Sequence, residues 1–152
     1  MTSLTLIRRI RARPSVVYAA LTTPEGIAHW WGPPDTAVVL LAETERSVGG
    51  RVRVRFRKVD GTEHESTGEF LELIDSTRVV MSFQWVVGGY PDECGQVSRV
   101  TIDLRAVDGG TEVTFTHAQL QTELSSEAHG WGWGGAFDRL AHYLSGSDTG
   151  NG

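Results

Sequence analysis

The chain is predicted to adopt an α+β fold in which a curved antiparallel sheet of about six or seven strands wraps around one long C-terminal helix. Two observations lead to this fold class. Residues 37–117 contain short segments in which apolar and polar side chains alternate, and tight turns separate these segments. Residues 125–144 instead repeat their large apolar side chains at helical spacing. A sheet with one apolar face can bury that face against such a helix.

The first segments of the chain predict a strand followed by two short helices. Residues 4–11 alternate in polarity, which is typical of a strand, and Arg8 falls on the apolar side of it. Arg8 therefore either points inward or marks a strand end. A proline begins a short helix over residues 15–21, because proline is tolerated in a first helical turn. A threonine and a proline repeat this start signal for a second short helix that reaches about Trp31.

Six further strands are predicted before the C-terminal helix, and short turns join most of them. Connections this short join antiparallel neighbours, so the strands are expected to follow one another as hairpins. One domain is expected over residues 1–145, followed by a disordered polar tail over residues 146–152. The six strands cover residues 37–45, 51–58, 63–74, 78–86, 96–106 and 111–117.

The hairpin over residues 51–74 can be predicted at the level of residue pairs. Arginines alternate with apolar residues in its first strand, and a three-residue loop ending in Gly61 is a common hairpin closure. That loop places Arg55 opposite Glu65 on the outer face, whereas a two-residue loop would place the arginines opposite neutral residues. Charge complementarity favours the three-residue loop. A bulge is expected after Phe70, where the alternation breaks.

The C-terminal helix combines a stripe of large apolar side chains, from Trp133 to Leu144, with a flank that includes Gly130 and Gly134. Four glycines within this helix cost about 3–4 kcal/mol of helix propensity. The glycine flank therefore either approaches the sheet very closely or leaves a hollow beside the helix. We expect the hollow, because glycines add no volume to fill the concave side of the sheet.

The inward-facing residues of the strands and the helix stripe form the candidate binding site. They are mainly apolar or aromatic, which suits a small apolar or aromatic molecule held between sheet and helix. The alternative is that these side chains simply fill the core. The candidate ligand-binding residues are Trp30, Phe56, His64, Ser66, Phe70, Phe83, Trp85, His117, Gly130, Trp133, Gly134 and Phe137.

No sequence motif for catalysis, metal binding or cofactor binding is recognised. The histidines lack the spacing of metal ligands, and neither a phosphate loop nor a dinucleotide-binding motif is present, so no metal and no cofactor are expected. Cys94 has no base beside it, which favours an inert thiol. No catalytic residue is assigned, and the chain is expected not to be an enzyme.

Composition also limits the expected partners and location. The net charge of −5 argues against nucleic acid, and no apolar run is long enough to enter and cross a membrane. The single cysteine and the absence of a signal-like start favour a cytoplasmic location. Trp131 falls opposite the apolar stripe, so it is either exposed or covered by a partner, which makes a homodimer an alternative to a monomer.

A set of motifs along the chain resembles one known family. Their order and spacing, over roughly residues 4–144, are similar to those of the heat-shock protein 90 ATPase activator-like branch of the START-like (SRPBCC) superfamily. The resemblance implies a helix-grip fold with a hydrophobic cavity between sheet and helix. The motifs are Thr23-Pro24-Glu25, Trp30-Trp31-Gly32-Pro33, Arg46-Ser47-Val48-Gly49-Gly50-Arg51, Asp60-Gly61-Thr62, Thr67-Gly68-Glu69 and Gly132-Trp133-Gly134-Gly135-Ala136-Phe137-Asp138-Arg139-Leu140.

The resemblance does not by itself determine function, because the superfamily includes lipid binders, hormone receptors, cyclases and resistance proteins. Two alternatives to simple ligand binding therefore stay open. One is a cyclase- or hydrolase-type enzyme that uses His64 or His117 as acid or base. The other is a co-chaperone that acts on the heat-shock protein 90 ATPase.

Overall fold

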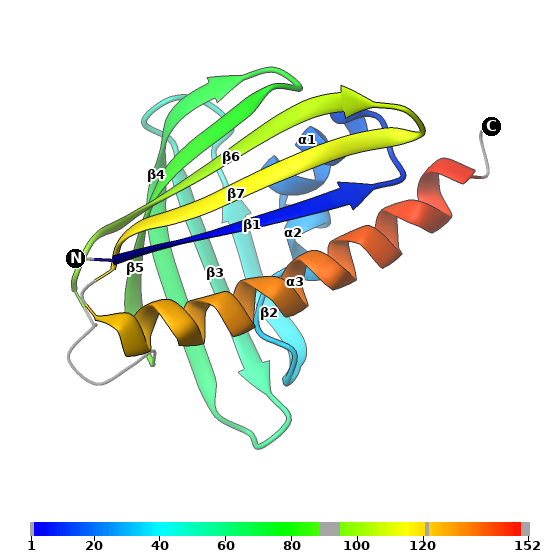
Figure 1. Cartoon of the computed structure of the whole chain (residues 1–152). Helices are drawn as coiled ribbons and strands as arrows, with labels where there is room; N and C mark the ends of the chain where they lie inside the picture. Colours follow the sequence, from blue (N-terminus) through cyan, green and yellow to red (C-terminus); the bar gives the residue numbers. More distant parts are fainter. Residues whose placement is uncertain (1, 89–94, 121, 150–152) are drawn as a thin grey trace.

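A computed structural model describes residues 2–88, 95–120 and 122–149 of the chain and confirms the α+β helix-grip fold (Figure 1). Every predicted strand and helix is present, with ends that differ by a few residues. The elements are β1 (Thr2–Ile10), α1 (Pro14–Thr22), α2 (Pro24–Trp30), β2 (Thr36–Thr44), β3 (Arg51–Lys58), β4 (Glu63–Ile74), β5 (Arg78–Val87), β6 (Ser98–Val107), β7 (Gly110–Leu120) and α3 (Glu123–Thr149).

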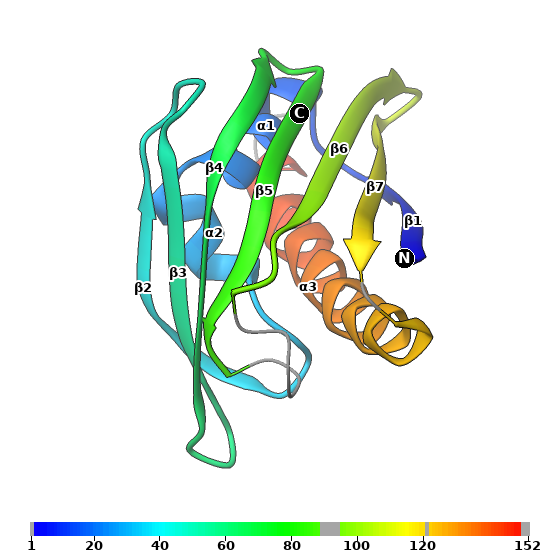
Figure 2. The same ribbon diagram turned by 90° about the vertical axis from the view of Figure 1, so that its left-hand side faces the viewer.

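The seven strands form one antiparallel sheet in the order β1-β7-β6-β5-β4-β3-β2. From β2 to β7 each strand pairs with the next strand along the chain, as the short turns predict. Strand β1 joins the far edge beside β7. Figure 2 shows the sheet curving around α3, with α1 and α2 inside the same curve. The apolar core lies between the inner face of the sheet and these three helices.

The predicted register of the β3–β4 hairpin is confirmed, with Arg55 opposite Glu65 and a positive φ of 91° at Gly61. The expected bulge is also present, since the β4–β5 register shifts just after Phe70. The structure adds one feature that alternation does not predict. Arg53 Nε and Arg55 Nη1 lie 3.0 and 3.1 Å from the Glu65 carboxylate, and they leave Glu65 only 6% exposed on the outer face.

Helix α3 buries its apolar stripe and continues to Thr149, beyond the end expected near residue 144. Residues 150–152 of the expected tail lie outside the described residues. Arg8 points from β1 toward α3, where its Nε lies 3.4 Å from the Asp138 carboxylate. Trp131 is 55% exposed. No helix in the described part of the chain is long and apolar enough to cross a membrane.

Hydrogen bonds hold the loop between α2 and β2 against the middle of α3. Arg139 Nη2 donates hydrogen bonds to the carbonyl oxygens of Gly32 and Pro33, the latter at 2.7 Å. A Cβ atom at Gly135 would collide with the Pro34 ring, so this glycine permits the close approach of helix and loop. The loop therefore forms a fixed wall beside the helix.

Candidate functional site

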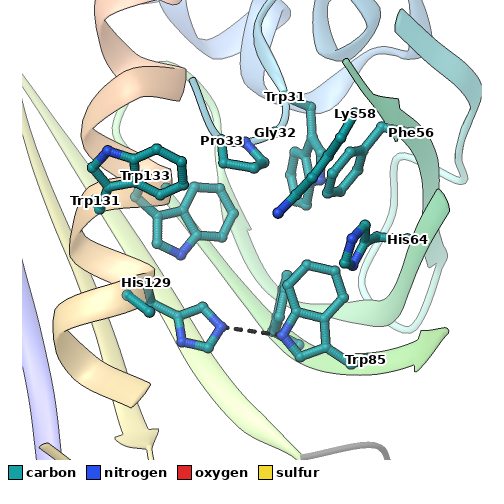
Figure 3. Close-up of a pocket in the computed structure, with 13 residues that line it drawn as sticks. Trp31, Gly32, Pro33, Phe56, Lys58, His64, Trp85, His129, Trp131 and Trp133 are labelled. Carbon is teal, nitrogen blue, oxygen red and sulfur yellow. Dashed lines mark hydrogen bonds between the residues drawn. The ribbon is translucent and has the colours of Figure 1, made fainter. Parts of the chain in front are cut away.

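A pocket of about 360 Å³ opens between the inner face of the sheet and the N-terminal half of α3 (Figure 3). This volume lies within the range of small-molecule sites. Its walls come from the loop after α2, the β3–β4 hairpin, β5 and α3. The described residues that line it are Trp31, Gly32, Pro33, Phe56, Lys58, His64, Phe83, Trp85, Ala128, His129, Trp131, Gly132 and Trp133.

The pocket walls are built mainly from aromatic rings that pack edge to face. The ring centroids of Trp31 and Trp133 lie 5.0 Å apart at 83°, and those of Phe83 and Trp85 lie 5.2 Å apart at 88°. Aromatic pairs at these distances and angles add to the stabilisation from burial. The walls are therefore mutually supported, and each ring presents an apolar surface to the pocket.

His129, in the first half of α3, is held by hydrogen bonds on both ring nitrogens. Trp85 Nε1 donates to His129 Nε2 at 3.2 Å (Figure 3), and His129 Nδ1 lies 2.9 Å from the carbonyl oxygen of Ser125. An indole nitrogen can only donate and a carbonyl can only accept. The proton of the neutral ring is thus on Nδ1, and His129 links the helix to strand β5.

His117 lies behind the pocket wall and is fully buried. Trp133 Nε1 donates to its Nδ1 at 3.0 Å, so its Nε2–H donates to Ser98 Oγ at 2.7 Å. Ser98 Oγ in turn donates to the carbonyl oxygen of Phe83 at 3.2 Å. Burial, and secondarily the nearby His129, place the pKa of His117 well below its ordinary value. This chain of hydrogen bonds leaves no ring nitrogen of His117 directed at a ligand.

The side of the pocket formed by the β3–β4 hairpin carries two polar side chains, His64 and Lys58. His64 stacks on Phe56 with ring centroids 5.3 Å apart, and its pKa is lowered by burial and by the neighbouring Lys58 ammonium. Lys58 reaches into the space between Trp31 and His64 (Figure 3). Among the described residues, no three side chains of the types that ligate metals gather at one point.

The structure brings five of the twelve candidate ligand-binding residues together in the pocket: Phe56, His64, Phe83, Trp85 and Trp133. Three others, Trp30, Phe70 and Phe137, belong to the packed core, which is the alternative that sequence reasoning left open. Ser66 is buried in β4 opposite Trp85 in the strand register, and His117 lies behind the wall.

Gly130 and Gly134 do not line the pocket, although the glycine flank was the sequence feature that suggested a hollow. A Cβ atom at Gly134 would meet the Arg8 side chain at 3.5 Å, and one at Gly130 would meet nothing within 4 Å. The flank thus faces β1, and the pocket lies on the other side of the apolar stripe, where Gly132 is found. The reason is the rotation of α3, which follows from its packing against β1 and the loop after α2.

Sequence reasoning missed several lining residues for which signals existed. Lys58 continues the inward row that alternation assigns to Val52, Val54 and Phe56. His129 precedes Trp133 by one helical turn and so shares its face. For Trp31 no such signal exists, because it directly follows the buried Trp30 at the end of a helix.

Comparison with known proteins supports the fold described above. The family model for "Activator of Hsp90 ATPase homolog 1-like protein" matches residues 11–145. A Chromobacterium violaceum protein of known crystal structure has 25% identity and a TM-score of 0.82, over 93% of this chain and 95% of that chain. The AHSA1 protein from Silicibacter pomeroyi has 20% identity and a TM-score of 0.80, over 95% of this chain and 98% of that chain. No protein with a curated description matches significantly.

Proposed function

The chain belongs to the family of activator of Hsp90 ATPase homolog 1-like proteins, and from this premise we propose that it binds a small hydrophobic or aromatic molecule in its pocket. The observation that carries the proposal is the aromatic-lined pocket of about 360 Å³ between the curved sheet and α3. A liquid water molecule occupies about 30 Å³. The pocket therefore has room for a molecule with at least about a dozen non-hydrogen atoms.

For the two buried histidines, His117 and His129, hydrogen bonding favours a structural role over acid–base catalysis. His117 uses both ring nitrogens within the protein, and His129 accepts from Trp85 and donates to Ser125. A general base must reach the proton that it removes, and these rings are committed to holding the walls in place. No feature of the described pocket favours action on the Hsp90 ATPase that the family name describes.

Tryptophan fluorescence provides a direct test, because Trp31, Trp85, Trp131 and Trp133 line the pocket. Titration with naphthalene-2-carboxamide, flavone and a medium-chain fatty acid is expected to give a saturable change with at least one of them. Trp30→Phe, a substitution in the packed core, is expected to leave the ligand-induced fluorescence change intact.

A matched pair of substitutions on α3 tests where the molecule binds. Ala128→Phe would place a ring in the pocket, so binding is expected to weaken strongly. Glu127→Phe introduces the same ring at an exposed neighbouring position and is expected to leave binding unchanged. Saturable binding of sugars or nucleotides alone would show that the proposal is wrong.

A further inference from the structure

We infer that the ligand of this pocket is an aromatic carboxylic acid whose carboxylate pairs with the Lys58 ammonium. This inference rests on the proposed function and adds the chemical class of the ligand. It starts from the position of Lys58, the last residue of β3, whose side chain is 23% exposed and points into a mainly aromatic cavity (Figure 3). An ammonium ion enclosed in this way loses solvation that only an anionic or hydrogen-bonding partner replaces.

Groups of the protein replace only part of the solvation that the Lys58 ammonium loses. The nearest carboxylate oxygen in the described part of the chain belongs to Asp35, 3.6 Å from Lys58 Nζ. Charge-assisted N–H···O hydrogen bonds are about 2.7–2.9 Å long, so this pair is an ion pair without a short hydrogen bond. An ammonium has three N–H donors, and these can be offered to a ligand.

Asp35 is also shared with a second cation. Burial lowers the pKa of the Arg139 guanidinium, and the negative charge of Asp35 opposes that shift. Lys58, Asp35 and Arg139 together carry a net charge of +1, and the Asp60 carboxylate also interacts electrostatically with Lys58. No described residue that lines the pocket is acidic. An anion entering the pocket would thus meet the Lys58 ammonium, with Asp35 as its nearest carboxylate, and no acidic side chain among the described lining residues.

The rest of the lining decides which kind of anion fits. One ammonium among tryptophan and phenylalanine rings suits a single carboxylate on a flat apolar body, and the rings can stack on that body. A nucleotide or an inorganic phosphate carries more charge than this one cation can pair. The chemistry of the lining therefore selects an amphipathic aromatic acid.

The test compares two ligands that differ in charge but have nearly the same shape. Naphthalene-2-carboxylate is ionised at neutral pH, and naphthalene-2-carboxamide is not. The wild-type protein is expected to bind the carboxylate about tenfold or more tightly, as expected for a hydrogen-bonded charge pair. Lys58→Met keeps most of the apolar stem and is expected to abolish this preference, while Lys58→Arg is expected to keep a preference for the acid.

Arg57→Met is the matched control, because it removes one positive charge from the outer face of the same strand. It is expected to keep the preference, and circular dichroism melting will verify that each variant is folded. Equal affinity of the wild type for the two probes would overturn this inference and leave the proposed function intact. Binding of neither probe would overturn this inference, and it would overturn the proposed function as well if flavone and the fatty acid also fail to bind.

Discussion

Single indole N–H groups determine the protonation of two buried histidines. Trp133 donates to His117 and Trp85 donates to His129, so each ring must present an unprotonated nitrogen to its tryptophan. A protonated imidazole could not accept either bond. The pocket walls therefore depend on histidines that stay neutral, and acid should weaken them.

The first prediction is a loss of stability on acidification that depends on His117. Burial depresses the pKa of His117 in the folded state, whereas in the unfolded chain it is about 6.5. Above that value both states are neutral at this residue. As the pH falls below it the unfolded state binds the proton first, so the free energy of unfolding declines by up to about 1.4 kcal/mol per pH unit, until the folded-state pKa is reached.

Urea unfolding of the wild type and His117→Gln, at about pH 7.5 and about pH 5.5, measures this contribution. The variant is expected to be less stable at the higher pH but to lose less on acidification. His64 also has a lowered pKa and the same sign of effect, so His64→Gln serves as the comparison. An equal pH-dependent loss in the wild type and His117→Gln would contradict the prediction.

Residue pairing in the β3–β4 hairpin shows what sequence can and cannot predict at this scale. Alternation and the three-residue loop predicted the pairing of Arg55 with Glu65, because side-chain direction in a strand has a strict period of two. They could not predict that Arg53 and Arg55 would both form ion pairs with Glu65. Which long side chains converge depends on sheet twist, and the sequence carries no local signal for it.

At the scale of elements, the glycines of α3 have different surroundings although they share one helix. Gly130 has open space around it, whereas Gly135 touches the Pro34 ring. The second prediction follows from this contrast. Gly130→Ala should stabilise the protein by about 0.8–1.0 kcal/mol, which is the difference in helix propensity. Gly135→Ala should destabilise it, because the proline ring and its backbone nitrogen, 3.0 Å from the added carbon, must move.

Thermal or urea unfolding of the two variants measures this difference, and the common Gly→Ala change makes each the control of the other. Stabilisation by both substitutions would show that the loop after α2 can move away from the helix at little cost in free energy.

Sequence alone identified the apolar stripe of α3 correctly, since helical periodicity is a local property. It could not determine which flank faces the pocket, because the rotation of the helix follows from its packing against β1 and the loop after α2, which are distant in sequence.

At the scale of the whole molecule, the pocket is assembled from segments that are far apart in the chain. The β3–β4 hairpin and β5 supply one wall, α3 supplies another, and the loop after α2 lies between them. The order of strands β2 to β7 could be predicted from short turns, whereas the position of this loop could not. It depends on hydrogen bonds from Arg139 to residues more than a hundred positions earlier, a distance at which no sequence periodicity operates.

The third prediction concerns Arg139, which ties two walls of the pocket together. Arg139→Met removes the donors to the Gly32 and Pro33 carbonyl oxygens while keeping an apolar stem of similar reach. Hydrogen bonds to a charged donor contribute about 1.5–3 kcal/mol, so the free energy of unfolding should fall by about that amount. Affinity for naphthalene-2-carboxamide should fall as well, because Gly32 and Pro33 line the pocket and would no longer be held against α3.

Urea unfolding and tryptophan fluorescence titration together measure both effects. Arg105→Met is the control, because Arg105 is a largely exposed arginine paired with Glu112 across β6 and β7, remote from the pocket lining. Loss of the Arg105 ion pair should change the free energy of unfolding by only about 0–1 kcal/mol and leave the affinity for the ligand unchanged. If Arg139→Met lowered stability but left the affinity intact, the loop would contribute to folding without shaping the pocket. The binding surface would then belong to the sheet and α3 alone.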